Sequence, residues 1–242
     1  MLIVHSERLT HQSRHKTEWH QHATGQLFCI QRGMMIVQTE QVQWALTPAT
    51  IGWFPAHLRH CAWTAGEVDG ISTQVEGEAF CAQAGVWPAD PFLLLLMERM
   101  AGSEGHRQQH LLAVMRDEIH HAPAAPLQLP LPDDRRARQV AEYLLLEPHS
   151  PLSQAQLAST FGMSTRTLSR LFSQQTGLCF SQWRQQTRIL AAMGWLLKGA
   201  SVSETAEQCG YENVSAFIAA FKQRFAMTPG EFRAQRSVVP AF

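Results

Sequence analysis

Short apolar runs separated by turn residues mark the first part of the chain. Residues 19–75 alternate apolar and polar stretches, are rich in β-branched and aromatic residues, and are interrupted by glycine and proline. This pattern is typical of short strands joined by tight turns. The next two segments, 92–100 and 106–121, carry apolar residues at helical spacing with two glycines between them. We therefore predict a small β domain followed by two amphipathic helices.

A proline-rich stretch then interrupts this pattern. Four prolines fall within ten residues of segment 123–133, which excludes a regular helix and an internal strand, so we interpret the segment as a linker. At its end Asp133 or Asp134 is expected to cap the next helix. From residue 135 onward the spacing is helical. The predicted fold is a multidomain α+β chain: a β domain over 1–122, a linker over 123–133 and an all-α domain over 134–242.

The α domain contains the same unit twice. Residues 157–184 return as 205–233, with one residue inserted in the second copy just after the turn. In each copy a short helix ends at a glycine, Gly162 or Gly210, and a polar residue opens the next helix. This is the sequence form of a helix-turn-helix, whose second helix can enter a major groove of DNA. We predict two such units.

The second helix of the first copy has a buried face and an open face. The buried face is expected to hold Met163, Leu168, Leu171 and Phe172. The open face is expected to hold the candidate base readers Thr165, Arg166, Ser169 and Arg170. The two arginines are one turn apart and each can donate bidentately to guanine. The alternative is that they are ordinary solvated arginines.

The second helix of the second copy offers fewer polar side chains. Asn213 and Ser215 are the plausible base readers, and the apolar residues beside them suit contact with thymine methyl groups. Lys222 and Arg224 lie near the end of this helix and are better suited to phosphates, which set affinity without reading sequence. We therefore expect the first copy to carry most of the direct base readout.

Charge is distributed unevenly although the chain as a whole is neutral. Up to Asp133 there are 8 basic and 13 acidic residues, a net charge of −5, and after it 12 basic and 7 acidic residues, a net charge of +5. The second half is thus the candidate for a polyanionic partner. Five cysteines without a C-x-x-C pair argue against a disulfide framework or a zinc finger. Without a signal-peptide core or a membrane-spanning apolar run, we expect a cytoplasmic protein with no membrane partner.

The α domain resembles the AraC/XylS family of bacterial transcription regulators. Residues 210–233, GYENVSAFIAAFKQRFAMTPGEFR, are close to the family signature, with departures at Ala226, where glycine is usual, and at Ala219, where an arginine is usual. The resemblance implies a long helix over 180–198 joining two helix-turn-helix units that span successive major grooves of promoter DNA. It also implies base-reading positions, which match Arg166, Ser169 and Arg170 in the first unit and Val214, Ser215, Ile218 and Ala219 in the second. The linker and the segment WRQQTRIL look like the subgroup that contains the nitroimidazole-resistance regulator.

Residues 19–60 resemble the cupin-like sensor domain found at the N-terminus of many such regulators. His20, His22 and Gln26 match the first cupin motif, and His60 ends the second. The resemblance implies a small barrel in which these four residues are candidate ligands of a divalent transition metal. Gln26 stands where cupin enzymes have glutamate, and a neutral amide weakens such a site. The alternative is that the histidines line a polar barrel mouth, with His57 in the turn.

Two further surfaces of the first domain are candidates for partners. Large aromatic residues are candidates for the floor of a pocket for a small aromatic effector, with core packing as the alternative: Phe28, Trp44, Trp53, Phe54 and Trp63. Apolar residues of the two helices are candidates for a homodimer interface, with packing inside the domain as the alternative: Leu93, Leu94, Leu96, Met97, Leu111, Leu112 and Met115. Cys61 is a candidate thiol sensor, with burial as the default.

The combined expectation is a sequence-specific DNA-binding transcription regulator and not an enzyme. Its partners are double-stranded promoter DNA, a small-molecule or metal effector in the N-terminal barrel, a second copy of the chain, and RNA polymerase. One alternative is a cupin-type metalloenzyme in which the α domain is an interaction module. Another is a non-specific architectural DNA binder, which the modest charge of the second half disfavours.

Overall fold

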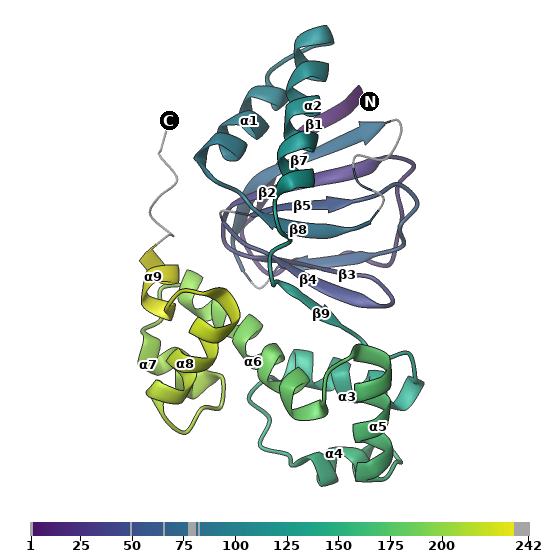
Figure 1. The fold of residues 1–242 in the computed structure, drawn as a ribbon, viewed down its shortest axis with the longest axis vertical. Helices are drawn as coiled ribbons and strands as arrows, with labels where there is room; N and C mark the ends of the chain where they lie inside the picture. Colours follow the sequence, from purple (N-terminus) through teal and green to yellow (C-terminus); the bar gives the residue numbers. More distant parts are fainter. Residues whose placement is uncertain (1, 49, 65, 77–80, 82, 235–242) are drawn as a thin grey trace. The chain divides into compact units, whose positions relative to one another are not determined.

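The computed structural model describes residues 2–48, 50–64, 66–76, 81 and 83–234, which fall into two compact units (Figure 1). Within the described ranges, residues 2–39 and 44–128 form the β unit. Residues 40–43 and 129–234 form the helical unit. The predicted combination of an N-terminal β domain and a helical domain is thereby confirmed.

The described strands form two mainly antiparallel sheets. The five-stranded sheet has the order β1-β7-β2-β5-β8 and the four-stranded sheet the order β6-β3-β4-β9. The strands are β1 (Leu2–His11), β2 (Gly25–Arg32), β3 (Met35–Gln38), β4 (Val42–Leu46), β5 (Thr50–Phe54), β6 (Cys61–Thr64), β7 (Val68–Glu76), β8 (Gly85–Pro88) and β9 (Gln128–Pro130). Short strands joined by turns are what the alternating pattern of residues 19–75 predicts.

Strand β1 is not predicted by the hydrophobic pattern. It pairs with β7 from Leu2 opposite Glu76 to His11 opposite Val68, but from residue 5 onward its side chains are exposed or half-buried. Polar side chains also interact across the pair, as in the ion pair between Arg8 and Asp69. The hydrogen bond to Arg8 holds the pKa of the Asp69 carboxyl below its ordinary value. Residues 5–11 therefore lack the alternation of buried and exposed residues that reveals a strand in sequence.

Two helices cover the outer face of the five-stranded sheet. They are α1 (Pro91–Ala101) and α2 (Gly105–His121), close to the predicted segments. Their buried side chains share one core with Leu27, Ile51 and Trp53 of the sheet. The seven predicted interface residues all belong to this core or pack against it. The prediction that they form a dimer interface is wrong, because the sheet needs that apolar surface to cover its own face.

The proline-rich segment is more ordered than a linker. Leu127, Leu129 and Leu131 are buried, and β9 occupies the edge position of its sheet. Proline is tolerated at an edge because no strand lies beyond it to accept the missing N–H. The prediction that this segment forms no internal strand therefore holds, but the prediction of a linker underestimates the burial of its leucines.

The helical unit contains seven helices within the described residues. They are α3 (Arg135–Leu146), α4 (Gln154–Thr160), α5 (Thr165–Thr176), α6 (Phe180–Leu197), α7 (Val202–Gln208), α8 (Val214–Phe225) and α9 (Pro229–Ala234). Asp134 caps α3, accepting from the backbone N–H groups of Arg136 and Ala137 at 3.0 and 3.1 Å. The long helix expected over 180–198 is α6. Among the described helices, none is both long enough and apolar enough to span a bilayer.

Candidate nucleic-acid interface and histidine cluster

The first helix pair, α4 and α5, is shaped by local capping chemistry. Ser153 and Gln156 form a capping box at the start of α4. Gly162, with φ of 70°, adopts the left-handed conformation that turns the chain after α4. The Ser164 hydroxyl then accepts from the backbone N–H of Thr167 at 3.1 Å and caps α5. The turn geometry is thus encoded in a few neighbouring residues.

The second helix pair, α7 and α8, repeats this construction. Ser201 and Glu204 form its capping box, Gly210 has a φ of 71°, and Asn213 caps α8 by accepting from the N–H of Ala216 at 2.7 Å. Equivalent core positions are buried in both copies; the pairs are Ala158 with Ala206, Leu168 with Phe217, and Phe172 with Phe221. The repeat seen in the sequence is therefore a repeat in three dimensions.

An arginine anchors each pair to the helix that follows it. Arg184 on α6 donates to the carbonyl of Leu152 at 2.7 Å and to the carbonyl of Ser150. Arg233 on α9, its equivalent in the repeat, donates to the carbonyl of Ala200 at 3.4 Å. Leu152 and Ala200 each stand just before the cap of the pair's first helix. The repeat aligns these two arginines, but their hydrogen bonds to the preceding carbonyls become apparent only in the structure.

The open face of α5 carries the predicted reading residues. Thr165, Arg166, Ser169 and Arg170 are all exposed. The Arg170 guanidinium donates to the Gln174 side chain at 3.0 Å, and Ser169 accepts from Gln154 of α4 at 2.7 Å. Opposite this face Leu168, Leu171 and Phe172 are buried as predicted, while Met163 in the turn is only half-buried. Helix α5 thus presents two cations, one turn apart, to solvent.

The open face of α8 is less charged. Ser215, Ala219 and Lys222 are exposed, and Val214 and Ile218 are half-buried beside them. The repeat aligns Ser215 with Arg166, Ala219 with Arg170 and Lys222 with Ser173, so the small residues of α8 stand where α5 has arginines. Ser173 is exposed and extends the α5 face by one turn. That position follows from the repeat alignment.

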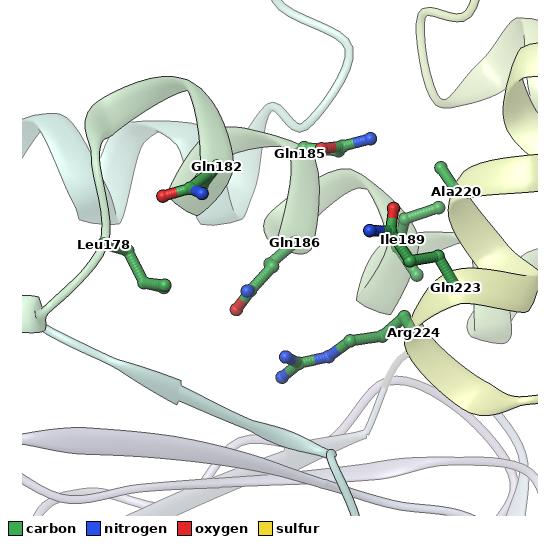
Figure 2. A pocket seen from close by; sticks show the side chains of 8 residues that line it. All are labelled: Leu178, Gln182, Gln185, Gln186, Ile189, Ala220, Gln223 and Arg224. Carbon is green, nitrogen blue, oxygen red and sulfur yellow. The ribbon is translucent and has the colours of Figure 1, made fainter.

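Arg224 lies on a different side of α8 from Lys222. Two residues along a helix rotate the side chain by about 200°. Arg224 is half-buried and lines a groove of about 290 Å³ between α6 and α8 (Figure 2). Glutamines 182, 185, 186 and 223 supply most of its polar lining. Burial lowers the pKa of the Arg224 guanidinium. Lys222 and Arg224 therefore lie on different sides of α8, and their contact with phosphates stays a prediction.

Three histidines converge in the β unit. His20 belongs to the connection between β1 and β2, and its backbone forms a two-way bridge with His60, N to O at 2.9 Å in both directions. The backbone of His22 is tied in turn to that of His57, which has a positive φ and lies in the predicted turn. One potential ligand nitrogen from each of His20, His22 and His60 lies within 4.8 Å of the others. The structure thus brings together all three histidines that the sequence singles out.

Hydrogen bonds and burial set the protonation of these rings. Nδ1 of His20 is 2.7 Å from the carbonyl of Glu18, and Nδ1 of His60 is 2.8 Å from the carbonyl of Leu58. A carbonyl only accepts, so both Nδ1 atoms carry hydrogen. Burial, and secondarily the charge of His20, lowers the pKa of His22. Burial also lowers the pKa of His60. The imidazoles of His22 and His60 are therefore neutral at pH 7.

Gln26, the fourth predicted ligand, lies on β2 opposite Phe54 in register. Its side chain is buried, and its Oε1 has no hydrogen-bond partner among the described residues. The ring of Phe54 lies 6.1 Å from that of His60. That Gln26 is a metal ligand stays a prediction.

The five aromatic residues predicted as one pocket floor do not share a surface. Phe28 and Trp44 each contact Phe54, with ring centroids 5.8 and 5.6 Å apart, between the two sheets. Trp53 instead packs on the helix side of its sheet, and Trp63 is half-buried on β6. The prediction of one floor is wrong because adjacent strand residues such as Trp53 and Phe54 point to opposite faces.

Cys61 is buried next to His60. Burial raises the pKa of its thiol. A raised pKa reduces the thiolate fraction, which is the reactive form. The default reading of Cys61 as a small buried residue agrees with this environment.

Comparison with known proteins relates this geometry to a family. A family model described as a helix-turn-helix domain matches residues 157–235, which include both helix pairs. The chain is 29% identical over 227 residues to the HTH-type transcriptional regulator NimR of Escherichia coli K12, covering 91% of this chain and 83% of NimR. It is 37% identical over 103 residues to the HTH-type transcriptional regulator RipA of Corynebacterium glutamicum, of whose length it spans 31%.

A solved structure is also similar, a transcriptional regulator of Chromobacterium violaceum described as containing an AraC-type DNA-binding domain. It is 27% identical, with a TM-score of 0.41, covering 43% of this chain and 95% of that one. The relationship to NimR extends across both units, and the helix-turn-helix match coincides with the repeated pairs that carry the family signature. The helix-turn-helix match, the similarity to NimR and RipA and the repeated helix pairs together support a DNA-binding transcription regulator of the AraC/XylS type.

Proposed function

We propose that the two helix pairs are two helix-turn-helix units that bind successive major grooves of promoter DNA, with α5 carrying most of the direct base readout. The observation that carries this proposal is the contrast between equivalent positions of the repeat. Arg166 and Arg170 are exposed on α5, whereas Ser215 and Ala219 occupy their places on α8. Arginine discriminates guanine bidentately, while small residues make weaker and less selective contacts.

The length of α6 supports this arrangement. Its 18 residues correspond to about 27 Å. Successive major grooves on one face of DNA are about 34 Å apart. A helix of this length separates two reading helices on the scale of one helical turn of DNA.

Selection from random duplex DNA with the full chain tests the proposal. Bound sequences should share two conserved segments with centres about 10 base pairs apart. The double variant Arg166→Ala/Arg170→Ala should lose the preference in one segment and keep it in the other. A single conserved segment, or a preference that does not depend on the two arginines, would contradict the assignment. Genome-wide immunoprecipitation in the native host then identifies the promoters.

The β unit is proposed to be a cupin-like barrel that binds an effector between its two sheets. Two buried polar atoms support this, Oε1 of Gln26 and Nε1 of Trp44, which have no hydrogen-bond partner among the described residues. A small molecule with one donor and one acceptor, lying against Phe28 and Phe54, would satisfy both atoms. A metabolite extract of the native host should change the affinity of the wild type for DNA but not that of Trp44→Phe. An equal response of both proteins would contradict the site.

A homodimer is proposed to form through the outward face of α1 and α2. Phe92, Leu95 and Val114 are 49, 46 and 40% exposed, unlike the helix residues that cover the sheet. Two chains would present four helix-turn-helix units to one long operator. Contact with RNA polymerase stays a proposal of the same kind. The metalloenzyme alternative is not favoured, because the relatives are transcription regulators.

A further inference from the structure

We propose that His20, His22 and His60 bind one divalent transition-metal ion of the zinc class. This site is independent of the proposed DNA interface, and it rests on three features of the β unit: convergence of the rings, fixed tautomers and the composition of the ligand set.

The convergence is held by the backbone rather than by the side chains alone. The bridge between His20 and His60 fixes two segments that are 40 residues apart in the chain. Around it, Thr17 donates to the carbonyl of Ala62 at 2.9 Å and Thr64 donates to that of His15, also at 2.9 Å. The connection before β2 is therefore bound along β6, and the histidines lie at its end. Such a scaffold limits the entropy that ligand side chains lose on binding a metal.

The spacing of the rings suits a small ion after modest adjustment. The ring centroid of His20 lies 4.8 Å from that of His22 and 4.5 Å from that of His60. The ligand nitrogens lie within 4.8 Å of one another. Zinc–nitrogen bonds of about 2.0–2.1 Å at tetrahedral angles require nitrogens about 3.3 Å apart. Binding therefore requires the three rings to move closer by rotation about their side-chain torsions.

Two of the tautomers are already those of metal ligands. Because the Nδ1–H groups of His20 and His60 donate to the carbonyls of Glu18 and Leu58, the lone pair of each ring is on Nε2. Histidines that bind metals characteristically donate their other N–H to a carbonyl or carboxylate, which orients the ring. Here the backbone performs this orientation, so it does not depend on a further side chain.

The ligand set selects the class of metal. The cluster consists of three imidazoles, and no described carboxylate or thiolate belongs to it. Magnesium and calcium require oxygen ligands, whereas imidazole suits zinc, copper and nickel. Three imidazoles leave a fourth tetrahedral position for water or another ligand. Zinc is therefore the appropriate probe.

The experiment measures zinc binding by the untagged full chain after removal of metal with a chelator. Equilibrium dialysis against Zn²⁺ with elemental analysis should find one ion per wild-type chain, and Zn²⁺ should raise its Tm. The variant His22→Gln should lose the bound ion and the rise in Tm. The matched control is His11→Gln/His15→Gln, because those two rings also stack, with centroids 4.2 Å apart; it should bind zinc like the wild type.

Folding and geometry are checked separately from stoichiometry. His22 is half-buried and His60 is buried, so His22→Gln is the milder change, and its metal-free Tm should match that of the metal-free wild type. Replacing zinc by Co²⁺ should give the visible absorption of a tetrahedral site in the wild type and not in His22→Gln. Failure of the wild type to bind zinc, or equal binding by His22→Gln, would overturn the proposal.

Discussion

Arginine side chains in the helical unit have three different surroundings, and these surroundings separate their roles. Arg166 and Arg170 point to solvent from α5. Arg184 donates to backbone carbonyls, and Arg224 lines the groove between α6 and α8. A side chain can read a base only if it reaches the groove of DNA from an open face. Residue type alone does not distinguish these cases.

Replacement of Arg170 by alanine should reduce sequence-specific binding. Loss of a bidentate contact to guanine costs about 1–3 kcal/mol, roughly 5- to 150-fold in Kd. Affinity for random DNA should change little. Fluorescence anisotropy with the selected site and with a scrambled duplex measures both values. Arg107→Ala, an exposed arginine on α2, is the control, and equal losses on the two DNAs would show that Arg170 contacts phosphate only.

Lys222 and Arg224 should differ in their effect on salt dependence. Lys222→Ala removes an exposed cation from the open face of α8, so it should weaken binding to all sequences and reduce the slope of log K against log salt by about one. Arg224→Ala should leave the slope unchanged, because its guanidinium faces α6. Titrations at several salt concentrations compare the two variants. A reduced slope for Arg224→Ala would show that the groove binds DNA.

At the scale of elements, each helix pair forms through local interactions, but its position against the following helix requires a further contact. Caps and left-handed glycines shape the two turns, but they do not determine where the pair packs. Arg184 and Arg233 supply that connection by donating to the carbonyls that precede α4 and α7. The orientation of a recognition helix therefore depends on a residue outside its own pair.

Arg184→Ala should destabilise the helical unit more than Arg233→Ala. A hydrogen bond to a charged group contributes about 1.5–3 kcal/mol, and Arg184 is half-buried, with two carbonyl acceptors. Arg233 is exposed and its bond is 3.4 Å long, so its loss should cost less than about 1 kcal/mol. Urea unfolding followed by circular dichroism compares the free energies. An equal loss of unfolding free energy in the two variants would contradict this prediction and show that the two arginines contribute equally.

At the scale of the whole molecule, the two units carry different chemical groups. The β unit contains the histidine cluster and the buried polar atoms of Gln26 and Trp44, while the helical unit carries the cations of α5 and α8. A regulator that responds to an effector needs a coupling between such units, which association of two chains can transmit. The oligomeric state is therefore the property to measure at this scale.

Leu95→Glu should convert the wild-type dimer into a monomer without lowering the Tm. Leu95 is 46% exposed on α1, so a charge there costs little in one chain but is unfavourable in an apolar interface. Light scattering after size-exclusion chromatography measures the mass. Glu142→Lys, an exposed position on α3 of the helical unit, is the control and should remain dimeric. A monomeric wild type would contradict the proposed interface.

Much of this structure was predictable because its causes are local. Ser153, Ser164 and Asp134 cap helices through neighbours two or three residues away, and Gly162 turns the chain by its own φ. Helical spacing, short strands and the internal repeat follow from the same short-range rules. The succession of a β domain and a helical domain, the repeated helix pairs and the exposed arginines of α5 could therefore be predicted from the residues alone.

Other features depend on which distant surface an apolar or polar side chain meets, and these appear only in the folded chain. Helical spacing places Leu93 and Met97 on one face of α1, but only the sheet beneath shows that this face is an internal core. Lys222 and Arg224 are two residues apart, yet α6 covers one of them and leaves the other open. Likewise, His20 and His60 become neighbours only through pairing of segments 40 residues apart. Burial and long-range pairing arise from contacts across the fold, which a local pattern of residues does not specify.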